Sequence, residues 1–271
     1  MPELPEVETT RRGIEPHITN SKIIRVDIHN PDLRWPVPTE LPDLITNKKV
    51  LRVTRRGKYL VLHFKNGYIL WHLGMSGSLR VLETPSDRQK HDHIEITFAN
   101  KKRLRFNDPR RFGCVLWSDE DIELHKLIHH LGPEPLTDEF HSDYLFQKSR
   151  KKTQKVKSWI MDSKVVVGVG NIYANESLFL SAINPNKPAG KLTKANCELL
   201  VDNIKTVLSK AISQGGTTLR DFVGGDGKPG YFAQELNVYG KEGTPCPKCK
   251  KPLTLRKIAQ RATVYCTQCQ K

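Results

Sequence analysis

The stretch Tyr59-Leu-Val-Leu-His-Phe-Lys-Asn66-Gly67-Tyr-Ile-Leu-Trp-His-Leu73 decides the fold of the first half of the chain. Asn66-Gly67 lies between two apolar and aromatic runs, and this dipeptide in that setting is a strong short-range signal for a hairpin. We therefore predict antiparallel strands over residues 59–64 and 68–73.

Further short strands are expected on both sides of this hairpin, over residues 22–29, 50–54, 78–82 and 93–98. The last of these alternates cleanly, with Ile94, Ile96 and Phe98 on one face and Glu95 and Thr97 on the other. Short strands at this spacing, interrupted by few helices, indicate an antiparallel sandwich or barrel rather than a parallel α/β sheet.

A short helix over residues 3–12 is expected ahead of this sheet. It should end near Gly13, because Pro16 would prevent it from resuming. Proline at its start and glutamate in its first turn suit any helix N-terminus, so an ordinary acidic helix start is one interpretation of Pro2-Glu3-Leu-Pro-Glu6.

The same residues support a chemical interpretation. If Met1 is removed, Pro2 becomes a secondary amine at the N-terminus, and an α-amino group titrates near pH ~8, which leaves a usable neutral fraction at pH 7. A neutral amine attacks an electrophilic carbon, and Glu3 beside it, with Glu6 one turn further on, would shuttle protons. The rest of the chain decides between the two interpretations.

The charge balance points to a polyanionic partner. The 271 residues carry a formal net charge of +15, and an excess of this size most often indicates nucleic acid binding. The chain has no apolar run long enough for a bilayer and no secretory signal, so we expect a cytoplasmic protein without disulfides.

The second half predicts helices over residues 121–131, 158–167, 171–182 and 193–214. Residues 148–157 are densely basic, either as a solvated linker face or as a phosphate contact. The turn Gly168-Val-Gly170 before Asn171 either aims a helix N-terminus at phosphate or forms a plain helical hairpin in a core. Residues 216–234 are rich in glycine, which is typical of a functional lid or of a disordered segment.

Four of the six cysteines form a pattern. Cys246-Pro-Lys-Cys249 and Cys266-Thr-Gln-Cys269 are separated by sixteen residues, a spacing that predicts one structural zinc ion held by four thiolates. Such a site has no open coordination position, so the metal would stabilise a hairpin rather than take part in catalysis. Without the metal this module has too little core to fold.

Three separate stretches carry a family resemblance that covers the whole chain. They are Pro2-Glu-Leu-Pro-Glu-Val-Glu-Thr9, Gly168-Val-Gly-Asn-Ile-Tyr173, and the four-cysteine finger with Gln260-Arg-Ala-Thr263. Together they resemble bacterial formamidopyrimidine-DNA glycosylase, the 8-oxoguanine repair family, and the Leu4 start separates the chain from the related endonuclease VIII.

The resemblance implies an α+β multidomain fold. It consists of an N-terminal antiparallel β-sandwich catalytic domain with a leading helix (1–130), a helix-two-turn-helix DNA-binding domain with a loop that covers the lesion (131–235), and a zinc-finger β-hairpin (236–271). It also implies a monomeric, nucleoid-associated protein without a membrane partner.

The implied activity is excision of oxidised purines from double-stranded DNA, followed by cleavage of the abasic site. Matched residue by residue, Pro2 would attack the sugar as a Schiff-base nucleophile, and Glu3 would act as acid and base with support from Glu6. Lys58, otherwise an ordinary strand lysine, would assist β-elimination, and Arg261 would grip phosphate and assist δ-elimination.

The resemblance also implies a set of DNA contacts. Met75, Arg110 and Phe112 match a trio that fills the void after a base flips out, although from sequence alone Met75 and Phe112 would be assigned to the core. The remaining matched contacts are His91, Lys152, Lys157 and Asn171. A competing hypothesis is a non-catalytic zinc-finger protein that binds DNA and whose N-terminus is only a helix start.

Overall fold

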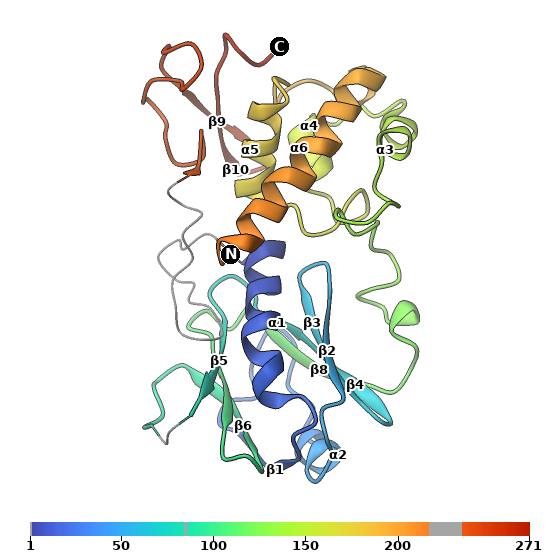
Figure 1. The fold of residues 1–271 in the computed structure, drawn as a ribbon, viewed down its shortest axis with the longest axis vertical. Coiled ribbons are helices and arrows are strands. Elements are labelled where there is room, and N and C mark those ends of the chain that lie inside the picture. Colours follow the sequence, from blue (N-terminus) through green and yellow to red (C-terminus); the bar gives the residue numbers. More distant parts are fainter. Residues whose placement is uncertain (1, 84–85, 217–234) are drawn as a thin grey trace. The chain divides into compact units, whose positions relative to one another are not determined.

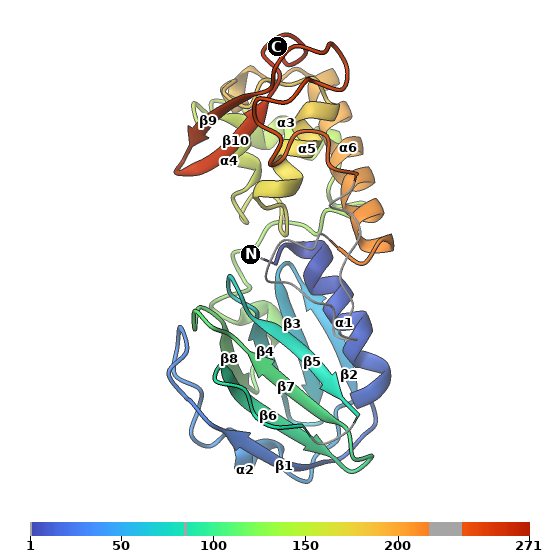
Figure 2. The same cartoon turned by 90° about the vertical axis from the view of Figure 1, so that its left-hand side faces the viewer.

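The computed structural model describes residues 2–83, 86–216 and 235–271. These residues form two compact units (Figures 1 and 2). The first contains the described residues up to His129 together with residues 214–216. The second contains His130–Ser213 and the described residues from 235 onward. No helix among them is long and apolar enough to cross a bilayer.

The described part of the first unit is built around two four-stranded antiparallel sheets (Figure 2). One sheet has the order β1 (Ile23–Ile28), β6 (Asp92–Phe98), β7 (Arg103–Asn107) and β5 (Ser78–Leu82). The other has the order β2 (Arg52–Arg56), β3 (Tyr59–Phe64), β4 (Gly67–His72) and β8 (Cys114–Ser118). The predicted sandwich is therefore confirmed.

The alternation in β6 is also confirmed, because Ile94, Ile96 and Phe98 are all fully buried in the core between the sheets. The hairpin turn differs by one residue from the expected Asn66-Gly67. Phe64 pairs with Gly67, so Lys65 and Asn66 form the turn. Strands β7 and β8 were not expected, although Arg-Leu-Arg-Phe-Asn in β7 alternates polar and apolar residues over its short length.

Helix α1 (Leu4–Ile18) continues past Gly13 and contains Pro16, so the predicted end at residue 12 is wrong. A proline this close to a helix C-terminus removes only one intrahelical hydrogen bond. Ile14 and Ile18 are fully buried on either side of it, and their burial holds the last turn in place. α1 packs against β2 and β5, which are edge strands of the two sheets (Figure 1).

Two predicted helices are shorter than expected. Residues 121–131 contain only the 3-10 turn η1 (Ile122–Leu124), because the ring of His125 accepts the Leu127 N–H at 3.2 Å and so competes with helical bonding. The stretch 158–167 contains only the end of α4 (Val156–Ile160). α2 (Leu41–Ile45) completes the helices of the first unit that the structure describes.

The second unit packs helices against a two-stranded hairpin. Its other elements are α3 (Ser142–Ser149), α5 (Asn171–Leu180), η2 (Ala189–Lys191), α6 (Lys194–Ser213), β9 (Thr254–Ile258) and β10 (Arg261–Tyr265). The start of α6 is confirmed, since the Thr193 hydroxyl accepts the Asn196 N–H at 3.0 Å. The helix ends as expected at Gly215 and Gly216, whose φ values are +74° and +80°.

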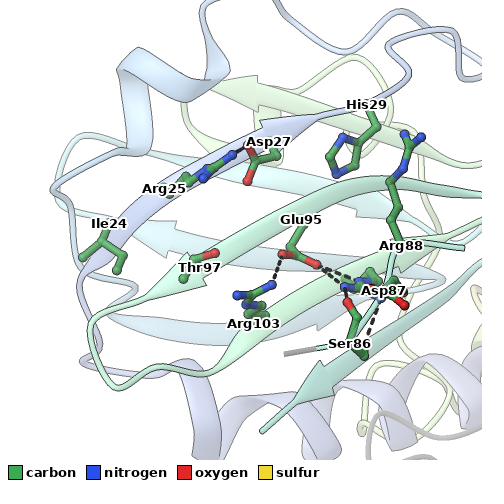
Figure 3. A pocket seen from close by; sticks show the side chains of 11 residues that line it. Ile24, Arg25, Asp27, His29, Ser86, Asp87, Arg88, Glu95, Thr97 and Arg103 are labelled. Carbon is green, nitrogen blue, oxygen red and sulfur yellow. Dashed lines mark hydrogen bonds and ion pairs between the residues drawn. The ribbon is translucent and has the colours of Figure 1, made fainter. Parts of the chain in front are cut away.

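The outer face of the β1-β6-β7 region carries a charged pocket of about 380 Å³ (Figure 3). Glu95 receives bonds from Arg103 at 3.0 Å and Arg105 at 2.7 Å, and Arg25 pairs with Asp27 at 2.7 Å. The Glu95 pairs join β6 to β7, whereas the Arg25–Asp27 pair lies within β1, so this face carries paired opposite charges both along and across its strands.

Candidate functional site

The N-terminus lies beside two buried carboxylates. Pro2 is buried, and Glu3 and Glu6 are each only 2% exposed. The Glu3 backbone N–H donates to Glu6 Oε2 at 2.8 Å, and the Glu3 side chain accepts the N–H of Glu6, which completes a capping box. The helix start predicted from the sequence is present, but acidic side chains this deeply buried are unusual for an ordinary helix end.

The glycine-rich stretch begins against Glu6. A Cβ atom added at Gly216 would lie 3.2 Å from Glu6 Oε1, so the backbone approaches closely. Its φ of +80° also favours glycine. Residues 217–231 of the expected lesion-covering loop lie outside the described residues.

Lys58 follows Gly57 in the turn between β2 and β3 and is half-buried. This turn is tied to α1 through Arg55, which pairs with Glu8 at 3.3 Å and donates to the Gly57 carbonyl at 2.9 Å. Burial alone would raise the pKa of Glu8, but bonds from Arg11 and Arg12 outweigh that effect and hold the pKa below its usual value. Glu8 is therefore a charged anchor between the N-terminal helix and the turn that carries Lys58.

His72, at the end of β4, is electrostatically linked to Lys58. Its Nδ1 accepts the Gly74 N–H at 2.9 Å, which requires an unprotonated nitrogen. Burial, with smaller contributions from Lys58 and Arg34, lowers the pKa of His72 from 6.5 to about 4. The histidine is therefore neutral at pH 7.

The three residues of the expected void-filling trio lie on loops of the first unit. Phe112 is 43% exposed and Met75 is half-buried, and neither belongs to the apolar core. The guanidinium of Arg110 stacks over the Phe112 ring at 4.8 Å. The core assignment that the sequence alone suggests for Phe112 is therefore wrong. His91 is half-buried beside His93, with ring centroids 6.5 Å apart.

In the second unit, Lys152 is exposed and Asn171 is the first residue of α5, directly after Gly168 (φ +81°) and Gly170. The Asn171 side-chain oxygen is buried without a hydrogen-bond partner in the described part of the chain. A buried, unpaired acceptor at a helix start has the capacity to bind a donor from outside the chain.

Lys157 lies in a different setting from that expected for a DNA contact. It is fully buried, and its ammonium donates to the Ala262 carbonyl at 2.7 Å and to Thr263 Oγ1 at 2.8 Å. The side chain reaches from α4 to residues 262 and 263 of β10, so its ammonium ends inside the unit. Lys157 therefore fixes the hairpin strand that begins at Arg261.

The hairpin presents Arg261 to solvent. This residue is the first of β10 and pairs with Ile258 across a two-residue turn, Ala259-Gln260, with φ values of +46° and +60°. Arg261 is exposed, as are Arg256 and Lys257 on β9. The exposed guanidinium suits a bidentate contact with phosphate.

The four cysteines of the two Cys-x-x-Cys pairs converge. Their sulfur atoms all lie within 4.8 Å of one another, with Cys249 and Cys266 at 3.4 Å and Cys246 and Cys269 at 4.0 Å. A tetrahedral ion with metal–sulfur bonds of about 2.3 Å places its sulfurs roughly 3.8 Å apart. The cluster therefore fits a metal ion.

Sequence reasoning missed three buried polar residues that hold these elements. Glu176 accepts N–H groups from residues 237, 238 and 239 at 2.8–2.9 Å, and Asn175 accepts the Val264 N–H at 2.9 Å. The available signal was the polar triplet Asn-Glu-Ser inside the otherwise apolar run 172–179. The third residue, Asp108, is fully buried in the first unit.

Comparison with known proteins places this architecture in one family. The model of the formamidopyrimidine-DNA glycosylase N-terminal domain matches residues 1–115, and the model of the H2TH domain of the same enzymes matches residues 131–223. Formamidopyrimidine-DNA glycosylases of Saccharophagus degradans and Escherichia coli are 64% and 56% identical over 271 residues, which is 100% of both chains in each case.

Solved structures agree with this placement. A Lactococcus lactis Fpg mutant in complex with Fapy-dG-containing DNA has a TM-score of 0.93 and 35% identity, with 100% of both chains covered. The Thermus thermophilus MutM (Fpg) protein has a TM-score of 0.89 and 35% identity, with 99% of this chain and 98% of that chain covered. The chain therefore belongs to the formamidopyrimidine-DNA glycosylase family.

Proposed function

We propose that this protein excises oxidised purines, 8-oxoguanine and formamidopyrimidines, from double-stranded DNA and then cleaves the abasic site. The observation that carries the proposal is the buried Pro2 next to the buried carboxylates of Glu3 and Glu6. An imine-forming amine needs a proton donor and acceptor close by, and this arrangement supplies both. A protein that only binds DNA has no use for carboxylates held in this way.

In the proposed reaction the Pro2 nitrogen forms a bond to C1′ of the flipped nucleotide, and the bond from C1′ to the base breaks. The base leaves with the electron pair and a proton, and Glu3 shuttles protons as the sugar ring opens to an iminium ion (the cationic imine of a secondary amine). Lys58 then assists loss of the 3′ phosphate by β-elimination, and Arg261 assists loss of the 5′ phosphate by δ-elimination. Hydrolysis of the imine restores the amine.

The proposed DNA surface combines a wedge with phosphate contacts. Met75 and Phe112 would fill the space left by the flipped base, and Arg110 would face the orphaned base. Exposed Lys152 and Arg261, with His91 and Asn171, would hold the backbone. Lys157 would act indirectly, because its ammonium holds the strand β10 on which Arg261 lies.

The proposed metal is a single structural Zn²⁺ on Cys246, Cys249, Cys266 and Cys269. The donor set of four thiolates supports zinc, and the ion would supply folding energy to the hairpin. We also propose the division into a catalytic sandwich (1–130), a helical DNA-binding domain (131–235) and a zinc finger (236–271), in a monomeric cytoplasmic protein.

Borohydride trapping tests the proposed chemistry. Reduction links DNA covalently only to an amine that has formed an imine with it. A variant with one alanine added ahead of Pro2 should lose trapping on an abasic duplex and keep its DNA affinity, because an acylated proline has no nucleophilic lone pair. Full trapping by the extended protein, with the extension verified by mass spectrometry, would refute the proposal.

A further inference from the structure

The loops that carry Met75, His91, Arg110 and Phe112 converge on one buried carboxylate, that of Asp108. The side chain is fully buried, and its Oδ1 accepts the Ser76 hydroxyl at 2.7 Å while Oδ2 accepts the Gly113 N–H at 2.8 Å. The Arg110 N–H completes the set, 3.3 Å from both Oδ1 and the Ser76 hydroxyl.

The backbone of Asp108 extends the same network to a third segment. Its N–H donates to the His91 carbonyl at 3.0 Å, and its own carbonyl lies 2.8 Å from His93 Nε2. One residue therefore contacts the segment after β4, the segment before β6 and the segment before β8.

The loops also meet directly, which leaves little freedom for independent movement. A Cβ atom added at Gly74 would lie 2.4 Å from the Gly113 nitrogen and 2.5 Å from the Phe112 carbonyl carbon. A Cβ at Gly113 would lie 2.8 Å from the His72 carbonyl oxygen and 3.1 Å from Asp108 Oδ2. The loop of Met75 and the loop of Phe112 thus pack backbone to backbone.

The chemistry of Asp108 is unusual for a purely structural residue. Its partners are neutral N–H and O–H groups, and no cationic side chain in the described part of the chain forms an ion pair with it. A buried carboxyl group without a cationic partner is costly to keep, whereas an apolar residue would serve the core better. An acceptor with several lone pairs, however, can bind donors from two loops at once.

We infer that Asp108 is a positioning residue for base excision, which holds Met75, Arg110 and Phe112 in the geometry needed to occupy the gap beside a flipped nucleotide. The inference rests on the proposed function, since it assigns no group that touches the reacting atoms. It predicts a specific defect when Asp108 is changed. Base excision, which needs the gap filled, should slow, and cleavage of DNA that already contains an abasic site should not.

The test compares Asp108→Asn with wild type in single-turnover reactions on duplexes containing 8-oxoguanine opposite cytosine, 8-oxoguanine opposite adenine, and an abasic site. The carboxamide keeps the shape but offers an NH₂ donor where an acceptor is needed. We expect excision opposite cytosine to fall at least tenfold, the preference for cytosine over adenine to shrink, and cleavage of the abasic duplex to stay within threefold.

Glu95→Gln is the matched control. Glu95, on β6, is another buried carboxylate, but it bonds to Arg103 and Arg105 of the neighbouring strand β7. Glu95 and Arg103 lie together on the outer face of the sheet (Figure 3). A loss of stability common to buried carboxylates would appear in both variants. A change in base preference should appear only in Asp108→Asn.

Wild-type excision and Pro2-dependent trapping come first, because their failure would refute the proposed function and not this inference. With wild type active, unchanged excision and base preference in Asp108→Asn would overturn the inference, and so would equal losses on all three duplexes. If Asp108→Asn does not fold, Ser76→Ala decides: a reduced preference for cytosine supports the inference, and wild-type preference and rate overturn it.

Discussion

The two units position their exposed side chains by different means. In the first unit, loops carrying Arg110 and Phe112 project from a sandwich whose two sheets enclose a large apolar core. In the second, Arg261 projects from a two-stranded hairpin whose apolar cluster is small and includes Cys246 and Cys266. A two-stranded hairpin is marginal alone, so this one depends on packing against α5, on buried polar contacts and, with the metal we propose, on its four thiolates.

Because of this difference, we expect the stability of the two units to respond differently to single substitutions. The first unit should tolerate changes at its exposed site residues, because its stability lies elsewhere. The hairpin should lose its order when a single polar or metal contact is removed.

Loss of the metal should have the largest effect. Cys249→Ser should lower zinc content by elemental analysis and leave the hairpin unfolded, because binding of structural zinc contributes roughly 10–16 kcal/mol to the folding of small modules. DNA affinity should fall with it. Cys197→Ala, which removes a buried cysteine of α6 far from the cluster in sequence, should keep both. A metal-free Cys249→Ser protein with wild-type affinity would contradict the account.

Lys157→Met should come next. The change leaves the Ala262 carbonyl and the Thr263 hydroxyl without their donor, which should destabilise the second unit by about 2–5 kcal/mol in urea unfolding. A direct phosphate contact would instead leave stability unchanged and lower the salt slope of DNA binding by about one. Lys152→Met is the exposed control, for which the second pattern is expected.

The pH dependence of the first unit should show a smaller loss. Because the pKa of His72 falls from 6.5 in the unfolded chain to about 4 in the folded one, the unfolded chain binds a proton that the folded chain does not between these values. Stability should therefore decline as pH drops from 6.5 to about 4, by roughly 2–3 kcal/mol from this group. Denaturant titrations of wild type and His72→Gln should diverge over that window, and parallel curves would refute the assignment.

The wedge residues should affect stability least. Phe112→Ala, at an exposed ring, and Met75→Ala, at a half-buried side chain outside the apolar core, should each cost under about 1 kcal/mol. Phe106→Ala, at a fully buried ring, should cost about 3–5 kcal/mol. Excision of 8-oxoguanine should nevertheless fall in both wedge variants, and more than cleavage at an abasic site. The test measures melting curves and single-turnover kinetics on the same variants. A severe drop in melting temperature would show that these residues belong to the apolar core.

The sequence predicted the features that depend on local pattern. The alternation at Ile94, Ile96 and Phe98 gave the sandwich, and the cysteine spacing gave the sulfur cluster. Local pattern could not show that Lys157 turns inward, because that depends on a contact with Thr263, more than a hundred residues later. Asp108 was missed for the same reason, since its partners Ser76 and His91 come together only in the folded sheet.

Some residues of the candidate site were predicted only from the family resemblance. Reasoning from the physical chemistry of the sequence alone would have given them ordinary structural roles. Phe112 reads chemically as a core residue, and Lys58 as an ordinary strand lysine. Burial of Glu3 and Glu6 is the structural feature that separates the N-terminus from a common helix start.

Identification of the trapped amine tests the central claim most directly. Wild-type protein would be reduced with borohydride on an abasic duplex, digested with trypsin and analysed by tandem mass spectrometry. The account predicts the sugar remnant on the peptide covering residues 2–11, at the Pro2 nitrogen. A remnant on Lys58, with an unmodified N-terminal peptide, would contradict it.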